Sequence, residues 1–275
     1  VEIDIRTVKD DNAEQIKDIR NFIKEGVDLL VVAPNEAAPI TPVVEEAFDR
    51  GIPVIVFDRK ILSDKYTAYI GADNYELGKA IGNYVANMLH GQGNVVEIAG
   101  LTGSTPAMDR HQGFVAAISP YPGIQLLARE DAGWLRSEAG EKMDTLLVRF
   151  PEIDVVYAQN DRMAAGAYDV AERQGRAEEM RFIGTDALPT PGKITLSALS
   201  SVSLSLVMTG STPSRFSAQS TEKRLPALCF MIAIFIQCCF FCRKIVFAKV
   251  TNYKQSPNKS DKKFVCDGSF LTRFL

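Results

Sequence analysis

Apolar residues recur at two alternating spacings over roughly the first two thirds of the chain. Short apolar runs, such as Val27–Ala33 and Pro53–Phe57, are typical of strands buried in a parallel sheet. Other stretches have a helical period, and in Asn74–His90 one apolar stripe is formed by Leu77, Ile81, Tyr84, Val85 and Met88. Strands and helices that alternate in this way predict parallel sheet with helices on both faces.

The same pattern gives a complete series of expected elements. The expected strands are Val1–Val8, Val27–Ala33, Pro53–Phe57, Tyr66–Ile70, Asn94–Ala99, Ile124–Ala128, Val155–Ala158 and Arg181–Gly184. The first of them alternates apolar and polar residues, which predicts a half-buried strand. The expected helices are one from Asp11 or Asn12 to Gly26, then Pro42–Arg50, Asn74–His90, Pro106–Ser119, Ser137–Phe150 and Asp161–Gly175.

The sequence changes in character after Gly192. Residues 193–275 contain 12 Lys or Arg against 3 Asp or Glu, whereas residues 1–192 contain 19 against 31. All five cysteines lie in this tail: Cys229, Cys238, Cys239, Cys242 and Cys266. Residues 225–242 form an apolar run interrupted only by Gln237, which as a helix would span about 27 Å. Three interpretations stay open, namely a frame-shifted or chimeric product, a membrane anchor and a buried helix.

Composition and motifs argue against several classes of function for the first 192 residues. An acidic segment does not favour nucleic acid as a partner, because phosphate binding requires clustered positive charge. Gly100–Gly103 follows a strand but lacks the lysine of a phosphate-binding loop. We find no nucleophile elbow and no metal-spaced histidine pair, so no cofactor or metal is expected and an enzyme is disfavoured.

Polar and aromatic side chains gather where the expected strands end. In open parallel sheets, ligands bind beyond the carboxyl ends of the strands. The candidate binding residues there or in the following loops and helices are Asp58, Arg59, Arg110, Trp134, Asn160 and Asp186. Carboxylates, guanidinium groups and an amide can exchange hydrogen bonds with hydroxyls, and an indole can stack on a sugar ring. This set suits a small polyhydroxylated ligand.

Each candidate also has a plain structural interpretation. Asp58 and Arg59 could form a solvated ion pair, and Asn160 with Asp161 could cap a helix. Arg110 could lie on the surface, Trp134 could be part of the core, and Asp186 could be an ordinary loop residue. His111 is adjacent to Arg110, but a lone histidine is more often structural than an acid–base catalyst.

Five segments at these strand ends resemble ribose-type periplasmic binding proteins and the sugar-binding domains of LacI-type repressors. They are Val54–Arg59, Ile70–Asn74, Gly100–Phe114, Tyr157–Asp161 with Met163–Gly166, and Phe182–Asp186. Three short stretches are similar to the periplasmic sensor domains of hybrid two-component histidine kinases, namely Ala33–Ala37, Asp58–Arg59 and Ser104–Met108.

The resemblance implies a type I periplasmic-binding-protein fold of two doubly wound parallel-sheet lobes. Residues 1–72 would belong to the first lobe, residues 73–191 to the second, and residues 192–275 to neither. Both lobes are expected to be incomplete, because the family's first strand and helix and its return through a hinge have no counterpart.

By position, Asp58 and Arg59 match the family's sugar-binding Asp-Arg pair. Arg110, Asn160 and Asp186 match its ligand-contacting residues of the same types, and Trp134 falls near its stacking aromatic after a one-residue gap. The sequence departs from the ribose binders at Ala33, where they place an asparagine, and Asn35 is the nearest replacement.

The resemblance implies a function in binding, without chemistry on the ligand. A monosaccharide or similar polyol would bind between the lobes of a periplasmic sensory domain, whose closure would pass to a membrane sensor kinase. Alternatives are the receptor of a sugar permease, the effector domain of a LacI-type regulator, and a small-molecule enzyme. No nucleic-acid contact is expected in this segment, and membrane contact only if residues 225–242 are an anchor.

Overall fold

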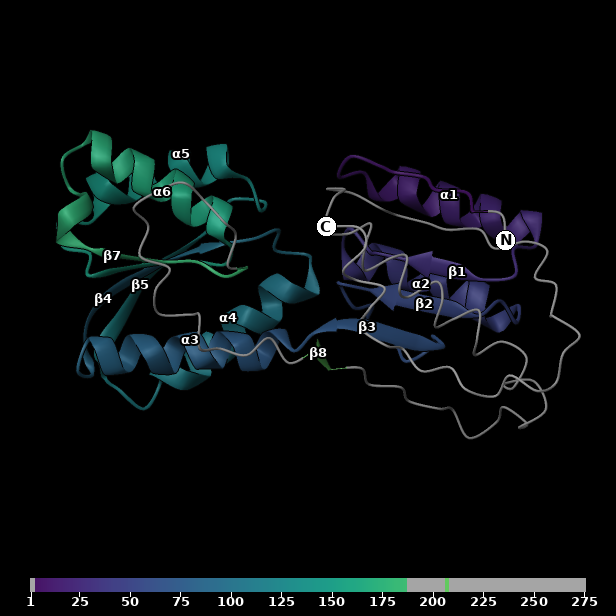
Figure 1. The fold of residues 1–275 in the computed structure, drawn as a ribbon, viewed down its shortest axis with the longest axis horizontal. Helices are drawn as coiled ribbons and strands as arrows, with labels where there is room; N and C mark the ends of the chain where they lie inside the picture. The colour runs from purple at the N-terminus through teal and green to yellow at the C-terminus, as the bar shows by residue number, and fades with distance from the viewer. Residues whose placement is uncertain (1–2, 187–205, 208–275) are drawn as a thin grey trace, which may run out of the picture.

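The computed structural model describes residues 3–186 and 206–207. They form two α/β lobes that lie side by side in Figure 1. We call residues 3–72 the first lobe and residues 73–186 the second lobe. The expected boundary at 191, and the interpretations of the tail and of its apolar run 225–242, lie outside the described residues; they and the expected boundary at 72 stay predictions.

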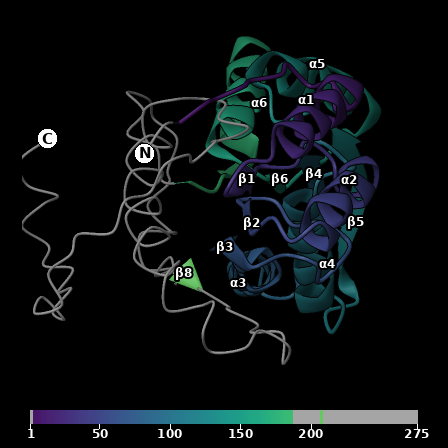
Figure 2. The same ribbon diagram turned by 90° about the vertical axis from the view of Figure 1, so that its right-hand side faces the viewer.

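The first lobe is a parallel sheet with two helices packed against it. Its elements are α1 (Asn12–Glu25), β1 (Leu30–Val32), α2 (Ala37–Asp49), β2 (Val54–Phe57) and β3 (Ala68–Ala72). The strands pair in the order β1-β2-β3, and β8 (Leu206–Val207) pairs antiparallel with β3. In Figure 2 both helices lie on one side of the strands, and their apolar side chains share one buried core with β1 and β2.

The second lobe is also a parallel sheet, but it has helices on both of its faces. Its elements are α3 (Asn74–Met88), β4 (Gln92–Ala99), α4 (Thr105–Ile118), β5 (Gly123–Asp131), α5 (Arg136–Arg149), β6 (Val155–Ala158), α6 (Asp161–Arg173), a 3₁₀ turn (Ala177–Glu179) and β7 (Arg181–Ile183). All its strands are parallel, in the order β5-β4-β6-β7. This confirms the predicted α/β fold class with parallel sheets.

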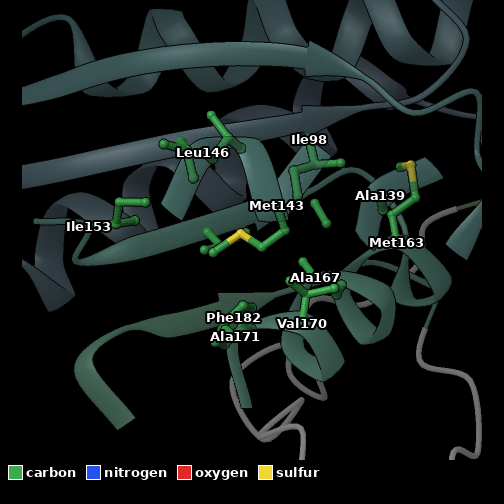
Figure 3. Packing of buried hydrophobic residues seen from close by; sticks show 14 of the residues in the cluster. Ile98, Ala139, Met143, Leu146, Ile153, Met163, Ala167, Val170, Ala171 and Phe182 are labelled. Carbon is green, nitrogen blue, oxygen red and sulfur yellow. The ribbon is translucent and has the colours of Figure 1, made fainter. Parts of the chain in front are cut away.

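Two cores flank the second sheet, because successive residues of a strand point to opposite faces. Val95 faces α3 and α4, where Phe114 stacks on Tyr157 with 4.6 Å between ring centroids. Val96 and Ile98 face α5 and α6, whose side chains pack over them (Figure 3). The sheet is therefore held rigidly between two helix layers, and its carboxyl ends are fixed in space.

Glycine allows α3 and α4 to pack closely. A Cβ at Gly78 would lie 2.0 Å from the backbone oxygen of Arg110, and one at Gly113 would lie 2.0 Å from that of Tyr75. Side chains at these positions would separate the helices. The close approach fixes where α4 presents Arg110.

Two expected elements were wrong in detail. The predicted strand Val1–Val8 is irregular over residues 3–8, where no described strand pairs with it. There Arg6 forms ion pairs with Asp18 and Glu25 of α1, and these contacts hold the segment in place of a strand ladder.

The second helix begins at Ala37 and not at Pro42. Pro39 occupies its first turn, where a missing N–H costs nothing, and Pro42 is accommodated one turn further along. The other helices and strands begin and end within a few residues of their expected bounds. Over residues 3–186 and 206–207, no helix is both long and apolar enough to cross a membrane.

Candidate functional site

Asp58 and Arg59 occupy the turn that follows β2. Asp58 has a positive φ of 62°, its N–H donates to the Ile70 carbonyl at 2.8 Å, and its own carbonyl accepts from the Tyr69 hydroxyl at 2.9 Å. Aspartate tolerates this left-handed conformation better than most residues. The backbone is thus fixed, and the carboxylate accepts no hydrogen bond within the described ranges.

The Arg59 guanidinium lies half-buried against the loop that follows β1. Its Nη1 donates to the Asn35 carbonyl at 2.5 Å. Burial lowers the pKa of Arg59, while the charges of Asp58, Asp10 and Glu36 oppose that shift. Its Nε and Nη2 make no hydrogen bond to the residues that the structure describes.

Arg110 lies on α4 and reaches the carboxyl ends of the second sheet. Its Nε donates to Asn74 Oδ1 at 2.9 Å, and its Nη1 donates to Thr185 Oγ1 at 2.9 Å and to the Gln159 carbonyl. Three acceptors from three elements therefore orient one guanidinium. Nη2 has no hydrogen-bond partner among the described residues.

Trp134 lies in the loop between β5 and α5 with a φ of 68°. A Cβ at Gly100 would lie 2.2 Å from its ring, so the indole rests directly on the glycine that follows β4. The Arg110 guanidinium carbon lies 5.6 Å from the ring centroid, within cation–π range. The indole Nε1 is buried without a hydrogen-bond partner in the described part of the chain.

Asn160 caps the N-terminus of α6. Its Oδ1 accepts from the Met163 N–H at 2.7 Å, and its Nδ2 approaches the Trp134 carbonyl at 3.4 Å. The capping role that the sequence left open is therefore present for Asn160. The strong hydrogen bond uses the amide oxygen of Asn160, and the amide nitrogen makes only the long one, so its donors are largely unused.

Asp186 follows β7 with a φ of 106°. Desolvation by the surrounding protein raises its pKa to about 6; the nearby charges of Asp161 and Asp58 act in the same direction, and Arg110 acts against them. The Thr185 hydroxyl, 3.5 Å away, is a weak partner. Asp58 belongs to the first lobe, so this coupling links carboxylates across the two lobes.

Three of the candidate residues are backbone outliers. Positive φ occurs at five non-glycine residues of the described chain, namely Asp10, Asp58, His90, Trp134 and Asp186. Such conformations cost free energy and persist where the surroundings enforce them, often at ligand sites. Their concentration at strand ends of both lobes supports a functional role for this region.

The two lobes touch directly beside these residues. The Ala37 N–H donates to the Gly103 carbonyl at 3.0 Å, and the Lys60 N–H donates to Thr105 Oγ1 at 2.7 Å. The Lys60 ammonium lies 3.8 Å from the Asp109 carboxylate. The loops that follow β1 and β2 therefore meet the loop and helix that follow β4.

Sequence reasoning did not select the residues of this contact or those that hold the candidate site in place. Gly103, Lys60 and Asp109 carry no local pattern that links distant segments. Asn74, Gln159 and Thr185 also follow strands, a signal that could have included them, and the structure shows that they hold Arg110.

The structure brings Arg110, Trp134 and Asn160 together by direct contact, and the charge of Asp58 reaches Asp186. Arg59 shares the turn of Asp58 but has no hydrogen bond to the other candidates among the described residues, and its guanidinium contacts Asn35 instead. Over the described residues, no group of three or more His, Cys, Asp or Glu side chains is arranged to hold a metal ion.

A domain family described as periplasmic binding protein domain matches residues 3–193. The chain belongs to this family. Among curated members, the galactofuranose-binding protein of Escherichia coli strain K12 is 37% identical over 168 residues, which are 58% of this chain and 53% of that protein. The ribose import binding protein of Salmonella typhimurium is 29% identical over 177 residues, which are 64% and 59% of the two chains.

Solved structures of periplasmic binding proteins agree with this assignment. A fructose-binding periplasmic domain of a hybrid two-component system is 60% identical, with a TM-score of 0.66, and the match covers 69% of this chain and 63% of that one. A galactofuranose-binding protein is 33% identical with a TM-score of 0.62, over 65% and 64% of the chains. The chain spans 53–59% of the length of the curated relatives named above.

Proposed function

We propose that this periplasmic binding protein domain binds a neutral monosaccharide between its two lobes. The observation that carries the proposal is unused hydrogen-bonding capacity at the strand ends of both lobes. The Asp58 carboxylate and two Arg59 nitrogens face no protein partner in the described chain, and the same holds for Nη2 of Arg110. A hydroxyl-rich molecule supplies both donors and acceptors to such groups.

The charges around the candidate site favour a neutral ligand. Asp58 and Asp186 contribute carboxylates, and Arg59 and Arg110 contribute guanidinium groups, so neither sign prevails. Ionised carboxylates cannot donate hydrogen bonds to an anionic ligand, and their negative charge would repel it. The Trp134 indole adds a flat apolar surface, which suits the C–H face of a sugar ring.

Fructose is the first ligand to test. The fructose-binding domain of a hybrid two-component system is 60% identical to this chain, whereas the galactofuranose-binding and ribose import proteins are 37% and 29% identical. Ligand preference is set by a few polar contacts, which diverge faster than the fold. Higher identity therefore supports fructose or a sugar of similar shape.

The same relative supports a sensory role. In this proposal the domain lies in the periplasm, and sugar contact with both lobes favours one lobe arrangement, which a membrane sensor kinase would read. A second role is delivery of the sugar to a permease, favoured by the import-binding function named for the ribose relatives. Fructose-dependent kinase phosphorylation in cells would support the first role, and fructose uptake that depends on this chain would support the second.

A thermal-shift panel tests the binding proposal. The full chain is heated with fructose, ribose, galactose or buffer, and the Asp58→Ala variant is treated in parallel. We expect fructose to raise the Tm of the wild type and to leave that of Asp58→Ala unchanged, because only a bound ligand shifts the folding equilibrium. No shift with any sugar would contradict the proposal.

Asp28→Ala is the matched control. Asp28 is an exposed aspartate of the same lobe, and it precedes β1, at the opposite end of the strands from Asp58. Its variant should respond to fructose as the wild type does. An equal loss of response in both variants would show that any lost carboxylate has the same effect.

A further inference from the structure

Glu97 is a carboxylate enclosed in the second lobe. It lies on β4 with no exposed surface, between Tyr157 of β6 and Arg129 of β5 in the strand register. Among the described residues it is the one glutamate or aspartate besides Asp161 that is buried. A buried carboxylate is costly unless hydrogen bonds and charges compensate it.

Two strong hydrogen bonds occupy the Glu97 carboxylate. Its Oε1 accepts from Gln159 Nε2 at 2.7 Å, and its Oε2 lies 2.6 Å from His111 Nδ1. The Arg129 Nε is 3.8 Å from Oε2 and has no hydrogen-bond partner in the described chain. Of these contacts, the hydrogen bond from Gln159 is the one that connects Glu97 to the carboxyl end of β6.

Gln159 uses every polar group it has. Its Nε2 also donates to the Ala107 carbonyl at 3.0 Å, and its Oε1 accepts from the Gly100 N–H at 2.9 Å. Its backbone N–H donates to the Ile98 carbonyl at 2.9 Å. A side chain satisfied at every donor and acceptor has one orientation, and it fixes the backbone that carries it.

That backbone is the support for the candidate sugar site. The Gln159 carbonyl accepts from Arg110 Nη1 and, at 2.8 Å, from the Thr185 hydroxyl. The next residue is Asn160, and Thr185 directly precedes Asp186. Arg110 is thus bonded to Gln159, the residue that Glu97 holds, and Asn160 is adjacent to it, while Asp186 follows Thr185, which donates to the same carbonyl.

We propose that Glu97 is a positioning residue of the sugar site, acting on Arg110 through Gln159. The role rests on the sugar-binding function proposed above. Glu97 does not touch the sugar. It keeps the Gln159 carbonyl where the Arg110 guanidinium needs its acceptor, and so it keeps Nη2 of Arg110 directed at the ligand.

A series at position 97 separates positioning from simple folding. In Glu97→Gln the amide oxygen still accepts from Gln159, so the fructose Kd should stay within about twofold of the wild type. In Glu97→Met the shape is retained but the acceptor is lost, and an unsatisfied Gln159 donor should weaken fructose binding about tenfold. The Tm of each unliganded variant is measured alongside.

Gln159→Met supplies the second arm. It removes the same link from the other end, together with the bonds to Ala107 and Gly100, so its fructose Kd should rise by at least the same factor. Because Glu97 acts through Gln159, the double variant should lose no more than Gln159→Met alone. A wild-type Kd in Glu97→Met, equal losses in Glu97→Gln and Glu97→Met, or losses that multiply would each overturn the proposal.

Two further measurements keep the outcome decisive. If Glu97→Met does not fold, Glu97→Asp withdraws the carboxylate from Gln159 by one methylene, and it should show the same tenfold loss. If the wild type binds no sugar, the binding function fails; the positioning role is then read from the NMR signal of the Arg110 Nε–H. That signal should move in Glu97→Met and stay in Glu97→Gln, and an unmoved signal in both would refute it.

Discussion

Burial raises the pKa of Asp186, which follows β7 of the second lobe, and the charge of Asp58, which follows β2 of the first lobe, raises that pKa further. Two carboxylates influence each other in this way only when they lie near one another. Together with the hydrogen bond from the Lys60 N–H to Thr105 Oγ1, this places strand ends of the two lobes near one another. This relationship underlies the proposal that one ligand contacts both lobes.

The pKa of Asp186, about 6, predicts a pH dependence. It lies above the ordinary value of 3.8, so the folded state favours the neutral acid, and this stabilising contribution is lost as the pH rises from about 4 to about 6. Ionised Asp186 is the stronger acceptor for hydroxyls, so fructose affinity should increase between about pH 5 and pH 7. Calorimetric titrations across this range measure the midpoint.

Asp58→Asn tests the coupling itself. Removal of the neighbouring negative charge should lower the pKa of Asp186, which carbon-detected NMR of its carboxyl group can follow. Asp28→Asn, at an exposed position in the same lobe, should leave that pKa unchanged. A pKa that does not move in Asp58→Asn would mean that the two carboxylates are not neighbours.

Arg110 is expected to be the least replaceable candidate residue. Arg110→Ala removes the donor to Asn74 and Thr185 and leaves the Gln159 carbonyl with the Thr185 hydroxyl alone, so fructose affinity should fall about 10-fold to 100-fold. Arg110→Lys keeps the charge but cannot reach these acceptors together, so it should recover only part of the loss. Full recovery by lysine would show that charge alone matters.

The contact between Gly103 and Glu36 should influence sugar binding through the lobe arrangement. A Cβ at Gly103 would lie 1.9 Å from Glu36 Oε2, so Gly103→Ala should displace the Glu36 side chain and strain the neighbouring bond from Ala37 N–H to the Gly103 carbonyl. Fructose affinity should fall.

Glu36→Ala removes the obstructing carboxylate and serves as the partner in a double-mutant cycle. In that background Gly103→Ala should cost less than it does alone. An equal loss of fructose affinity in the wild-type and Glu36→Ala backgrounds would show that the clash with Glu36 is not the cause.

Trp134 is the single tryptophan of the sequence, so its emission reports on the candidate site. A Cβ at Gly100 would lie 2.2 Å from its ring, and Gly100→Ala should displace the indole and shift the emission maximum of the unliganded protein. Gly140→Ala is the control, because the nearest atoms to a Cβ there belong to Val170, at 3.2 Å, and Gly166, and not to the indole ring. Equal shifts in both variants would contradict the contact.

Much of the fold could be predicted because each lobe repeats one local pattern. The apolar runs of β2 and β6 and the stripe of α3 are signals within a few residues of each other. The strand expected over residues 1–8 failed because a strand requires a partner, and partners are not encoded locally.

The candidate site likewise contains residues that the sequence could predict and residues that it could not. Asp58, Asn160 and Asp186 follow strands, so topology alone selects them. Lys60 with Asp109 and Glu97 with Gln159 are pairs separated by 49 and 62 residues, and neither pair has a motif. Such contacts exist only once two elements have packed, which is why the sequence could nominate the ligand groups but not their supports.

A fructose titration of one variant from each lobe, followed by Trp134 emission, tests the central claim most directly. We expect a saturable change in the wild type and in Asp28→Ala, and a large loss of affinity in both Asp58→Ala and Asn160→Ala, since one sugar would contact both lobes. Saturable binding that survives either of the last two substitutions unchanged would show that the sugar does not bridge the lobes.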